Sequence, residues 1–316
     1  KDVAGYRVSY DGSRIAYVSG AGAQQVTLLE GSRATVLAQS DAVYRVLDYD
    51  FSSQANTLFF IAEDEQGELQ LYLMDDSRPV WVATGFSLRA QLSRDGNTLI
   101  YAVGDDIQGY SVFSYAVNRR QSTEILQGNQ IRISLVDELG RVLITQQDGD
   151  EMTVYSAALD GRDVVQLFRD RDAYHGFILR HPALPGIFIH TYDHDGEHSI
   201  FYTPIDVDSG YYLFKEYITL EVKDISPDGD WLLTVANKNN RDEPALTLIP
   251  LTPDQTPVIL DESRYGFTTA VFSESGKDVY YTMRVGGDPD ERIVRRVSTS
   301  GELPAEPLYE GVNLLD

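Results

Sequence analysis

A short apolar strand, a tight polar turn and a second apolar strand recur seven times along the chain, at intervals of about 41 to 47 residues. Most copies keep a Gly at the turn, preceded by Asp or Ser. Gly tolerates the positive φ that a hairpin turn needs, and Asp or Ser side chains bond the backbone of their own turn. The copies are Ser9–Tyr17, Phe51–Phe59, Leu92–Tyr101, Val136–Leu143, His181–Phe188, Ile225–Leu232 and Phe272–Tyr280. A strand repeat of this period is typical of a β-propeller.

Each copy holds four strands, as the third shows with Leu99–Val103, Tyr110–Val117 and Ser122–Leu126, after which Ile131–Leu135 opens the next copy. Turn residues recur every 8 to 12 positions, and no useful stretch has helical periodicity. We therefore predict an all-β fold, a seven-bladed β-propeller with four antiparallel strands per blade, as one domain over residues 1–316. The predicted blades are about 5–40, 44–84, 86–127, 130–168, 176–215, 218–261 and 266–310.

The ends of the chain bear on how the last blade is completed. Gly5–Tyr10 matches a first strand and Pro307–Tyr309 a last one. The seventh blade is therefore predicted to be complete without a strand from the N-terminus. Val312–Leu315 is then surplus, and could clasp the first blade or begin a further segment.

The sixth copy carries a family resemblance. Its run Ser226-Pro227-Asp228-Gly229, within Ile225–Leu233, resembles the WD40-like repeats of TolB-type propellers, which are mostly bacterial and extracytoplasmic. Such repeats occur in scaffolds, in sensors and in the gating domains of peptidases, so the resemblance implies the architecture and a periplasmic or extracellular location. It also implies that the chain could belong to a longer membrane-attached regulator. TolB itself typically has six blades, which argues against that particular protein.

Charge and cysteine content restrict the partners. The net charge of −23 and the scarcity of Lys relative to Arg argue against nucleic acid and anionic membranes, which bind through cationic side chains. The absence of Cys rules out disulfides and thiolate sites, and makes an oxidising compartment harmless. The apolar stretches are far short of the roughly 18 residues that span a bilayer. Because Lys1 is not an initiator Met and no signal peptide is present, we expect a mature or excised fragment.

Acidic residues gather in one class of predicted loop. Propeller topology places the loop between the second and third strands of a blade on the same face as the loops that join blades. Six of these seven loops carry acid: Glu63–Glu65, Asp105–Asp106, Asp148–Glu151, Asp193–Glu197, Asp242–Glu243 and Asp288–Glu291. One hypothesis is a face that attracts a basic protein or divalent cations. The other is that acid suits solvated hairpins and keeps the protein soluble.

Arg and Tyr occur together in the predicted blade-joining loops Tyr44–Arg45, Phe168–His175 and Glu262–Tyr265. Arg can bind a carboxylate in bidentate fashion and Tyr offers a large amphipathic surface, which favours recognition. Covering the blade core is the alternative role. The candidate partner-binding residues are Arg45, Asp148, Asp150, Arg169, Arg171, Tyr174, Arg264, Tyr265, Asp288 and Asp290.

All five His residues lie between positions 175 and 198. A five-residue hairpin loop would place His198 opposite Tyr192, which makes His190 and His198 diagonal neighbours about 7 to 8 Å apart. The candidate metal ligands are His190, Asp193, Asp195 and His198, for zinc or manganese. No HxH or HExxH spacing occurs and the acidic run is too short for a calcium loop, so packing histidines are the alternative and no cofactor is expected.

No residue is predicted to be catalytic. The chain lacks the Ser-x-Asp-x-Gly-x-Thr-Trp box of sialidases and the G-x-S-x-G nucleophile turn of hydrolases. We expect a non-enzymatic binding, scaffold or sensor propeller that recognises a protein or a ligand through its acidic face. The alternatives are a metal-dependent lyase that uses His190 and His198, the gating propeller of a prolyl-oligopeptidase-like peptidase, and a purely structural assembly module.

Overall fold

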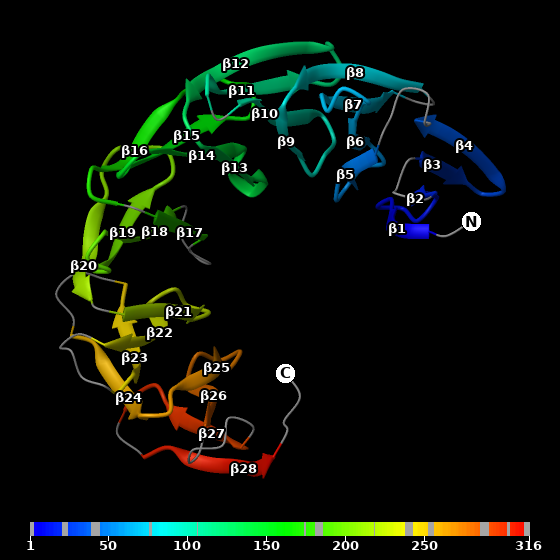
Figure 1. The fold of residues 1–316 in the computed structure, drawn as a ribbon. Helices are drawn as coiled ribbons and strands as arrows, with labels where there is room; N and C mark the ends of the chain where they lie inside the picture. The colour runs from blue at the N-terminus through cyan, green and yellow to red at the C-terminus, as the bar shows by residue number, and fades with distance from the viewer. Residues whose placement is uncertain are drawn as a thin grey trace. The chain divides into compact units, whose positions relative to one another are not determined.

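The computed structural model describes residues 3–20, 25–38, 45–75, 78–105, 107–173, 175–180, 186–217, 219–237, 243–251, 256–284, 291–301 and 304–312. Its strands form seven antiparallel sheets, each made of four strands that are consecutive in the chain (Figure 1). We number them sheets 1 to 7 in chain order. The predicted seven-bladed β-propeller with four strands per blade is confirmed. Among the described residues, no helix is long and apolar enough to cross a membrane.

The chain divides by packing into two compact units, Lys1–Asp148 with Thr153–Arg169, and Gly149–Met152 with Asp170–Asp316. That the sheets form a single domain stays a prediction. The strands of sheets 1 to 4 are β1 (Val3–Val8), β2 (Arg14–Ser19), β3 (Gln25–Glu30), β4 (Arg33–Ala38), β5 (Arg45–Phe51), β6 (Leu58–Glu63), β7 (Leu69–Asp75), β8 (Arg78–Gly85), β9 (Ser87–Leu92), β10 (Thr98–Asp105), β11 (Gly109–Ala116), β12 (Gln121–Gly128), β13 (Ile131–Val136), β14 (Arg141–Asp148), β15 (Glu151–Ala158) and β16 (Val165–Asp170). A short 3-10 helix, η1 (Asp137–Leu139), joins β13 to β14.

Sheets 5 to 7 belong to the second unit. Their strands are β17 (His175–Arg180), β18 (Gly186–Tyr192), β19 (His198–Pro204), β20 (Tyr211–Tyr217), β21 (Thr219–Ile225), β22 (Trp231–Asn237), β23 (Ala245–Pro250), β24 (Val258–Glu262), β25 (Phe267–Phe272), β26 (Asp278–Arg284), β27 (Glu291–Ser298) and β28 (Glu306–Val312). Sheet 7 is complete from its own strands, as predicted. Val312 pairs with Glu291, however, so it ends β28 and is not surplus, because the outer strand runs past Tyr309. Residues 313–316 lie outside the described residues.

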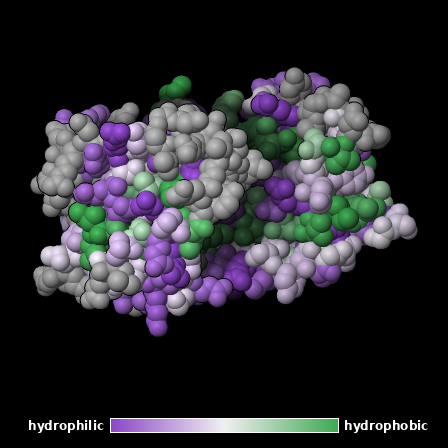
Figure 2. All heavy atoms as spheres, turned by 90° about the horizontal axis from the view of Figure 1, so that it is seen from below, coloured by the Kyte–Doolittle hydropathy of each residue, from purple (hydrophilic) through white to green (hydrophobic). Residues whose placement is uncertain are grey.

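The core lies between neighbouring sheets. The middle strands are apolar on both faces, as in β6, where Leu58, Phe60 and Ala62 pack toward sheet 1 and Phe59 and Ile61 toward sheet 3. A strand buried on both faces needs a neighbour on each side, which explains the continuous apolar runs of the repeat. The exposed surface is mixed: the face seen in Figure 2 shows both hydrophilic and hydrophobic patches.

Each sheet has two distinct ends, because four consecutive antiparallel strands turn back alternately. The turns between strands one and two and between strands three and four lie at what we call the turn end. The connections between strands two and three and the segments that lead to the next sheet lie at the opposite, loop end.

A shared hydrogen-bond network shapes the first turn of several sheets. In sheet 3, buried Ser93 donates its hydroxyl to Asp95 (2.7 Å) and accepts the N–H of Thr98 (2.9 Å), while Gly96 takes the positive φ of 71°. The N–H of Asn97, followed by the Ser93 hydroxyl, lowers the pKa of Asp95. The Ser and Asp that recur in the repeat therefore fix the conformation of the turn, and they make the same bonds in sheets 1 and 6.

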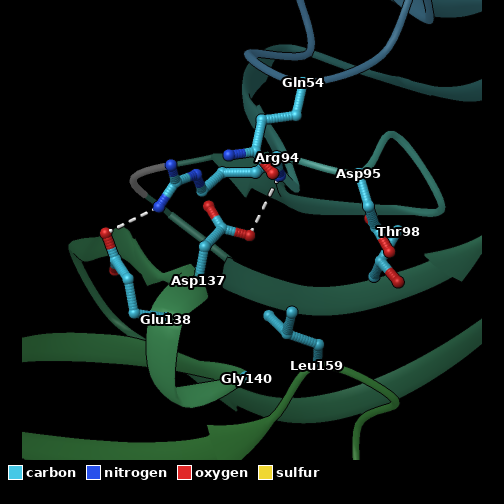
Figure 3. Close-up of a pocket in the computed structure, with 8 residues that line it drawn as sticks. All are labelled: Gln54, Arg94, Asp95, Thr98, Asp137, Glu138, Gly140 and Leu159. Atoms are coloured by element: carbon cyan, nitrogen blue, oxygen red, sulfur yellow. Dashed lines mark hydrogen bonds and ion pairs between the residues drawn. The ribbon is translucent and has the colours of Figure 1, made fainter.

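Turns of neighbouring sheets bond to one another at the turn end. The N–H of Gln54 in sheet 2 donates to the carbonyl of Arg94 in sheet 3 (2.8 Å). Arg94 in turn donates its N–H to Asp137 and its guanidinium to Glu138 of η1 (both 3.0 Å), around a cavity of about 400 Å³ (Figure 3). The amide of Asn56 likewise donates to Asp11 of sheet 1 (2.7 Å).

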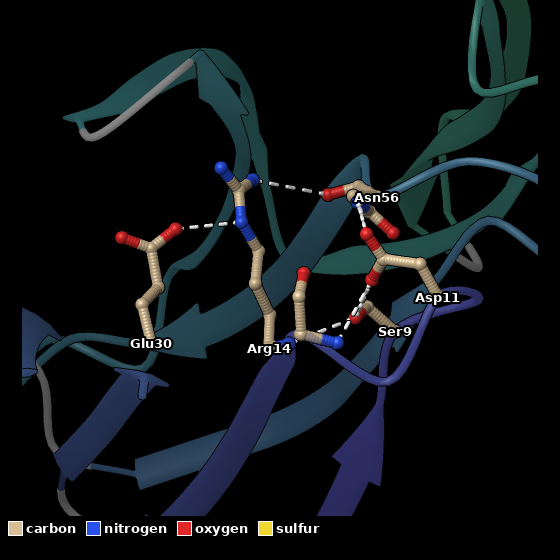
Figure 4. Close-up of polar contacts among 6 residues, drawn as sticks. Ser9, Asp11, Arg14, Glu30 and Asn56 are labelled. Carbon is tan, nitrogen blue, oxygen red and sulfur yellow. Dashed lines mark hydrogen bonds and ion pairs between the residues drawn. The ribbon is translucent and has the colours of Figure 1, made fainter. Parts of the chain in front are cut away.

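Arg14 extends the contact between sheets 1 and 2. It donates to the carbonyl of Asn56 (3.4 Å) and pairs with Glu30 at 2.6 Å (Figure 4). Within the first unit, the turn ends therefore share one face. The loop ends share the other.

The first turn of sheet 2 lacks the Asp that accepts the Ser hydroxyl in sheet 3, so the two turns should respond differently to loss of their Ser. Gln54 stands where Asp95 stands in sheet 3, and the Ser52 hydroxyl has no hydrogen-bond partner among the described residues. Ser52 and Ser93 are each 2% exposed. We expect Ser93→Ala to lower the free energy of unfolding by about 1 to 2 kcal/mol, because it leaves the partly buried N–H of Thr98 unpaired. Ser52→Ala should change it by less than about 0.5 kcal/mol. Urea denaturation of both variants tests this, and equal losses would contradict it.

Candidate functional site

The acidic residues predicted to share a face lie at the loop ends of their sheets. Those in the described residues are Glu63, Asp64 and Glu65 in sheet 2, Asp105 in sheet 3, Asp148, Asp150 and Glu151 in sheet 4, Asp193, Asp195 and Glu197 in sheet 5 and Glu243 in sheet 6. Asp106, Tyr174, Asp242, Asp288 and Asp290 lie outside the described residues.

Segments that join successive sheets also lie at the loop end, as the topology predicted, and some of their residues contact these acids. Arg45, at the start of β5, forms an ion pair with Glu63 at the end of β6. Asn129, between β12 and β13, donates its amide to Asp148 (3.1 Å). Arg171, after β16, pairs with Glu151 of β15 at 3.6 Å. Two of the predicted Arg residues, Arg45 and Arg171, therefore contact acids of the predicted acidic loops.

The candidate Arg residues are engaged by their own chain. Besides Arg45 and Arg171, Arg264 stacks on Tyr265, with the guanidinium carbon 4.7 Å from the ring centre. Arg169 was predicted to lie in a blade-joining loop, but it lies in β16, because that strand continues to Asp170. The Asp170 carboxylate accepts a hydrogen bond from the Tyr212 hydroxyl at 2.6 Å. Arg45 and Arg171 thus neutralise part of the negative charge at the loop ends.

The histidine pair adopts the predicted register, with His198 opposite Tyr192. The two imidazoles are closer than the expected 7 to 8 Å because both rings turn toward each other: His190 Nε2 lies 2.9 Å from His198 Nδ1, and the ring centres are 5.1 Å apart. Burial and then the neighbouring His198 charge lower the pKa of His190 to about 4. Burial also lowers the pKa of His198, against the charge of Asp193. The pair is therefore neutral at pH 7 and shares one N–H between the rings.

The described residues contain no group of three or more His, Cys, Asp or Glu side chains placed to hold a metal. Asp193 accepts the N–H of Glu197 (2.8 Å) within its hairpin, and Asp195 lies in the same hairpin. His181 and the side chain of His175 are outside the described set. A metal shared by His190 and His198 would have to replace the hydrogen bond between their rings, so the metal site stays a prediction.

One cavity was not anticipated from the sequence. A cavity of about 390 Å³ lies along the first strands of sheets 2, 3 and 4, and its lining includes Asp48, Asp50 and Asp137 as well as the apolar residues Leu92 and Leu135. Burial, with the charge of Asp50, raises the pKa of Asp48. Chemically, such a cavity suits a cation with an apolar body. Its three carboxylates are not among the predicted loop acids.

No protein-family model matches the chain, and no curated protein matches it by sequence. Among solved structures, it is similar to TolB from Acinetobacter baumannii at 12% identity and a TM-score of 0.40, over 95% of this chain and 77% of that one. It is similar to the β-propeller domain of the Trilobed protease from Pyrococcus furiosus at 14% identity and a TM-score of 0.44, over 85% and 86%.

A third similar structure is the acylaminoacyl peptidase of Pyrococcus horikoshii, at 12% identity and a TM-score of 0.44, over 86% of this chain and 47% of that one. The similar structures thus include TolB, as the repeat motif predicted, and peptidases. Likeness at this level concerns fold alone. The class, a seven-bladed β-propeller, is defined by the seven sheets of the chain itself.

Proposed function

We propose that the chain is a non-enzymatic binding propeller that acts in the periplasm or outside the cell as a scaffold or sensor domain, and captures a cationic protein partner at the loop ends of its sheets. The observation that carries the proposal is a set of carboxylates without cationic partners. Among the described residues, no Lys or Arg pairs with Glu65, Asp105 or Asp148, which occupy the loop ends of three successive sheets.

Electrostatics favours a cationic partner. The net charge is −23, and Arg45 and Arg171 are already paired with acids of the same end. The remaining carboxylates therefore produce a negative potential that a basic surface would relieve. Such fields raise association rates and are screened by salt. A cationic partner thus accounts for the acid at these positions.

The enzymatic alternatives have no supporting geometry among the described residues. A lyase centre at His190 and His198 would require the imidazole pair to separate. A peptidase gate would require a hydrolase domain outside the 316 residues. Attachment to a longer membrane-bound polypeptide belongs to the proposal, and sequencing the reading frame around this segment would test it.

Neutralising the loop-end acids should weaken capture of a cationic polypeptide. We expect the triple variant Glu65→Gln, Asp105→Asn and Asp148→Asn to bind an immobilised Lys-Gly repeat peptide about three- to tenfold more weakly at low salt than the unchanged protein. The amides keep the local hydrogen bonds, so the fold is retained. Biolayer interferometry at about 50 and 200 mM salt measures the difference, which should shrink as salt screens it.

A matched control separates the site from net charge. Glu124→Gln, Asp160→Asn and Glu274→Gln remove three charges from exposed positions away from the loop ends. The control variant should bind the peptide as the unchanged protein does. Equal weakening by both triple variants would show that only total charge matters and would reject a loop-end site.

A further inference from the structure

Two large apolar side chains are exposed at the loop end of sheet 3. Phe86, between β8 and β9, is 65% exposed, and Ile107, in the hairpin between β10 and β11, is 93% exposed. Ile107 is the most exposed large apolar residue among those described. Single exposed apolar residues are ordinary, but two in adjoining loops are a candidate for contact with another molecule.

The strand register places these residues next to each other. β9 pairs with β10, and Ser87 lies opposite Gly104. The pairing ends at this point; Phe86 precedes Ser87 and Asp105 follows Gly104, so Phe86 lies at the same end of sheet 3 as the hairpin that carries Ile107. The connection lies close against β10, because a Cβ on Gly85 would be 2.4 Å from Val103 Cγ2.

The hairpin holds Ile107 in a fixed outward position. The Asp105 carboxylate accepts the N–H groups of Ile107 (2.8 Å) and Gln108 (2.6 Å). Gly109 turns the chain with a φ of 85°, and a Cβ there would lie 3.0 Å from the carbonyl oxygen of Gly128. A side chain presented by a braced loop loses little entropy on binding, which favours a role in recognition.

Acid borders this apolar pair. The hairpin packs on the segment that contains Asn129, and Asn129 donates to Asp148 of the next sheet (3.1 Å). The carboxylate of Asp105 thus belongs to the hairpin that carries Ile107, and that of Asp148 is linked to the same hairpin through Asn129. An apolar centre with a charged border is the usual anatomy of a protein interface.

We propose that Phe86, Asp105, Ile107, Asn129 and Asp148 form a docking surface for a basic polypeptide segment that carries an aliphatic or aromatic side chain next to its Lys or Arg residues. This inference rests on the proposed function and specifies its partner. Charge complementarity selects the occupant: a second copy of this chain would bring the same negative charge, and an anionic membrane would be repelled. A simple cation would leave Phe86 and Ile107 uncovered.

Two peptides of equal charge test the docking surface. One contains Lys, Gly, Leu and Phe, and in the other Ser replaces Leu and Phe. We expect the unchanged protein to bind the first at least about tenfold more tightly. The variant Phe86→Ser with Ile107→Ser should lose that preference and bind the Ser peptide as before. Because both side chains are exposed, the variant should fold normally, and its circular dichroism spectrum checks this.

The control variant Val36→Ser with Ile259→Ser changes two exposed apolar residues on outer strands and should keep the preference. If the unchanged protein binds neither peptide, the proposed function itself fails. If it binds both equally, the acidic face stands and the apolar docking surface is overturned. Light scattering gives a further outcome. If the unchanged protein is a dimer and the variant Phe86→Ser with Ile107→Ser is a monomer, the surface binds a second copy of the chain, and the proposed basic partner is overturned.

Discussion

Replacing Gly96 by Ala is expected to lower the free energy of unfolding by about 2 to 4 kcal/mol, from two separate costs. Gly96 has a φ of 71°, where an L side chain is strained. Its added Cβ would also lie 2.4 Å from Thr57 Oγ1, 2.9 Å from Thr57 Cβ and 3.2 Å from Ala55 Cβ. The turn of sheet 3 packs directly on the turn of sheet 2, so the overlap forces the two sheets apart.

Gly12 supplies a matched control, because it occupies the same position in the turn of sheet 1. Its φ is also 71°, but an added Cβ would meet nothing within 4 Å. Gly12→Ala should therefore show the backbone cost alone, about 1 to 2 kcal/mol. Urea denaturation followed by circular dichroism measures both variants. If the two losses are equal, the packing of successive turns contributes nothing to stability.

The strands were predictable because their signals are local. Alternating apolar residues and Gly-containing turns placed a strand at Ile131–Leu135, and the structure has β13 at Ile131–Val136. The gathering of acids at one end of the sheets follows from strand order alone, which explains why Asp105 and Asp148 lie where the repeat placed them.

Contacts between sheets were beyond a sequence argument. Nothing local indicates that Gly96 approaches Thr57, because this contact depends on the packing of blades. The ion pair between Arg45 and Glu63 lies within sheet 2, between two neighbouring strands, and depends on side-chain rotamers. Ile107 is a similar case. An apolar residue in a hairpin loop could fold back onto the core, but Ile107 is 93% exposed, in a hairpin where its own N–H and that of Gln108 bond to Asp105.

Acidification should destabilise the protein through the buried histidine pair. His190 is 6% exposed and its pKa is lowered to about 4, mainly by burial, against 6.5 in the unfolded chain. The folded state therefore favours the neutral ring, and this stabilisation is complete above pH 6.5 and is lost as the pH falls toward 4. By linkage, His190 alone should reduce the free energy of unfolding by about 2 to 3 kcal/mol between pH 7 and 4.5.

Variants separate this effect from the titration of the many carboxylates. His190→Gln removes the titrating ring and keeps a group that can hydrogen-bond to His198, so its stability should fall much less between pH 7 and 4.5. His194→Gln changes a half-exposed histidine beside Asp150 and should retain the steep fall of the unchanged protein. Urea denaturation at several pH values gives the slopes. If the free energy of unfolding falls with pH equally steeply in the unchanged protein and in His190→Gln, protonation of His190 does not destabilise the folded state. The buried ring pair is then not the acid-sensitive element of sheet 5.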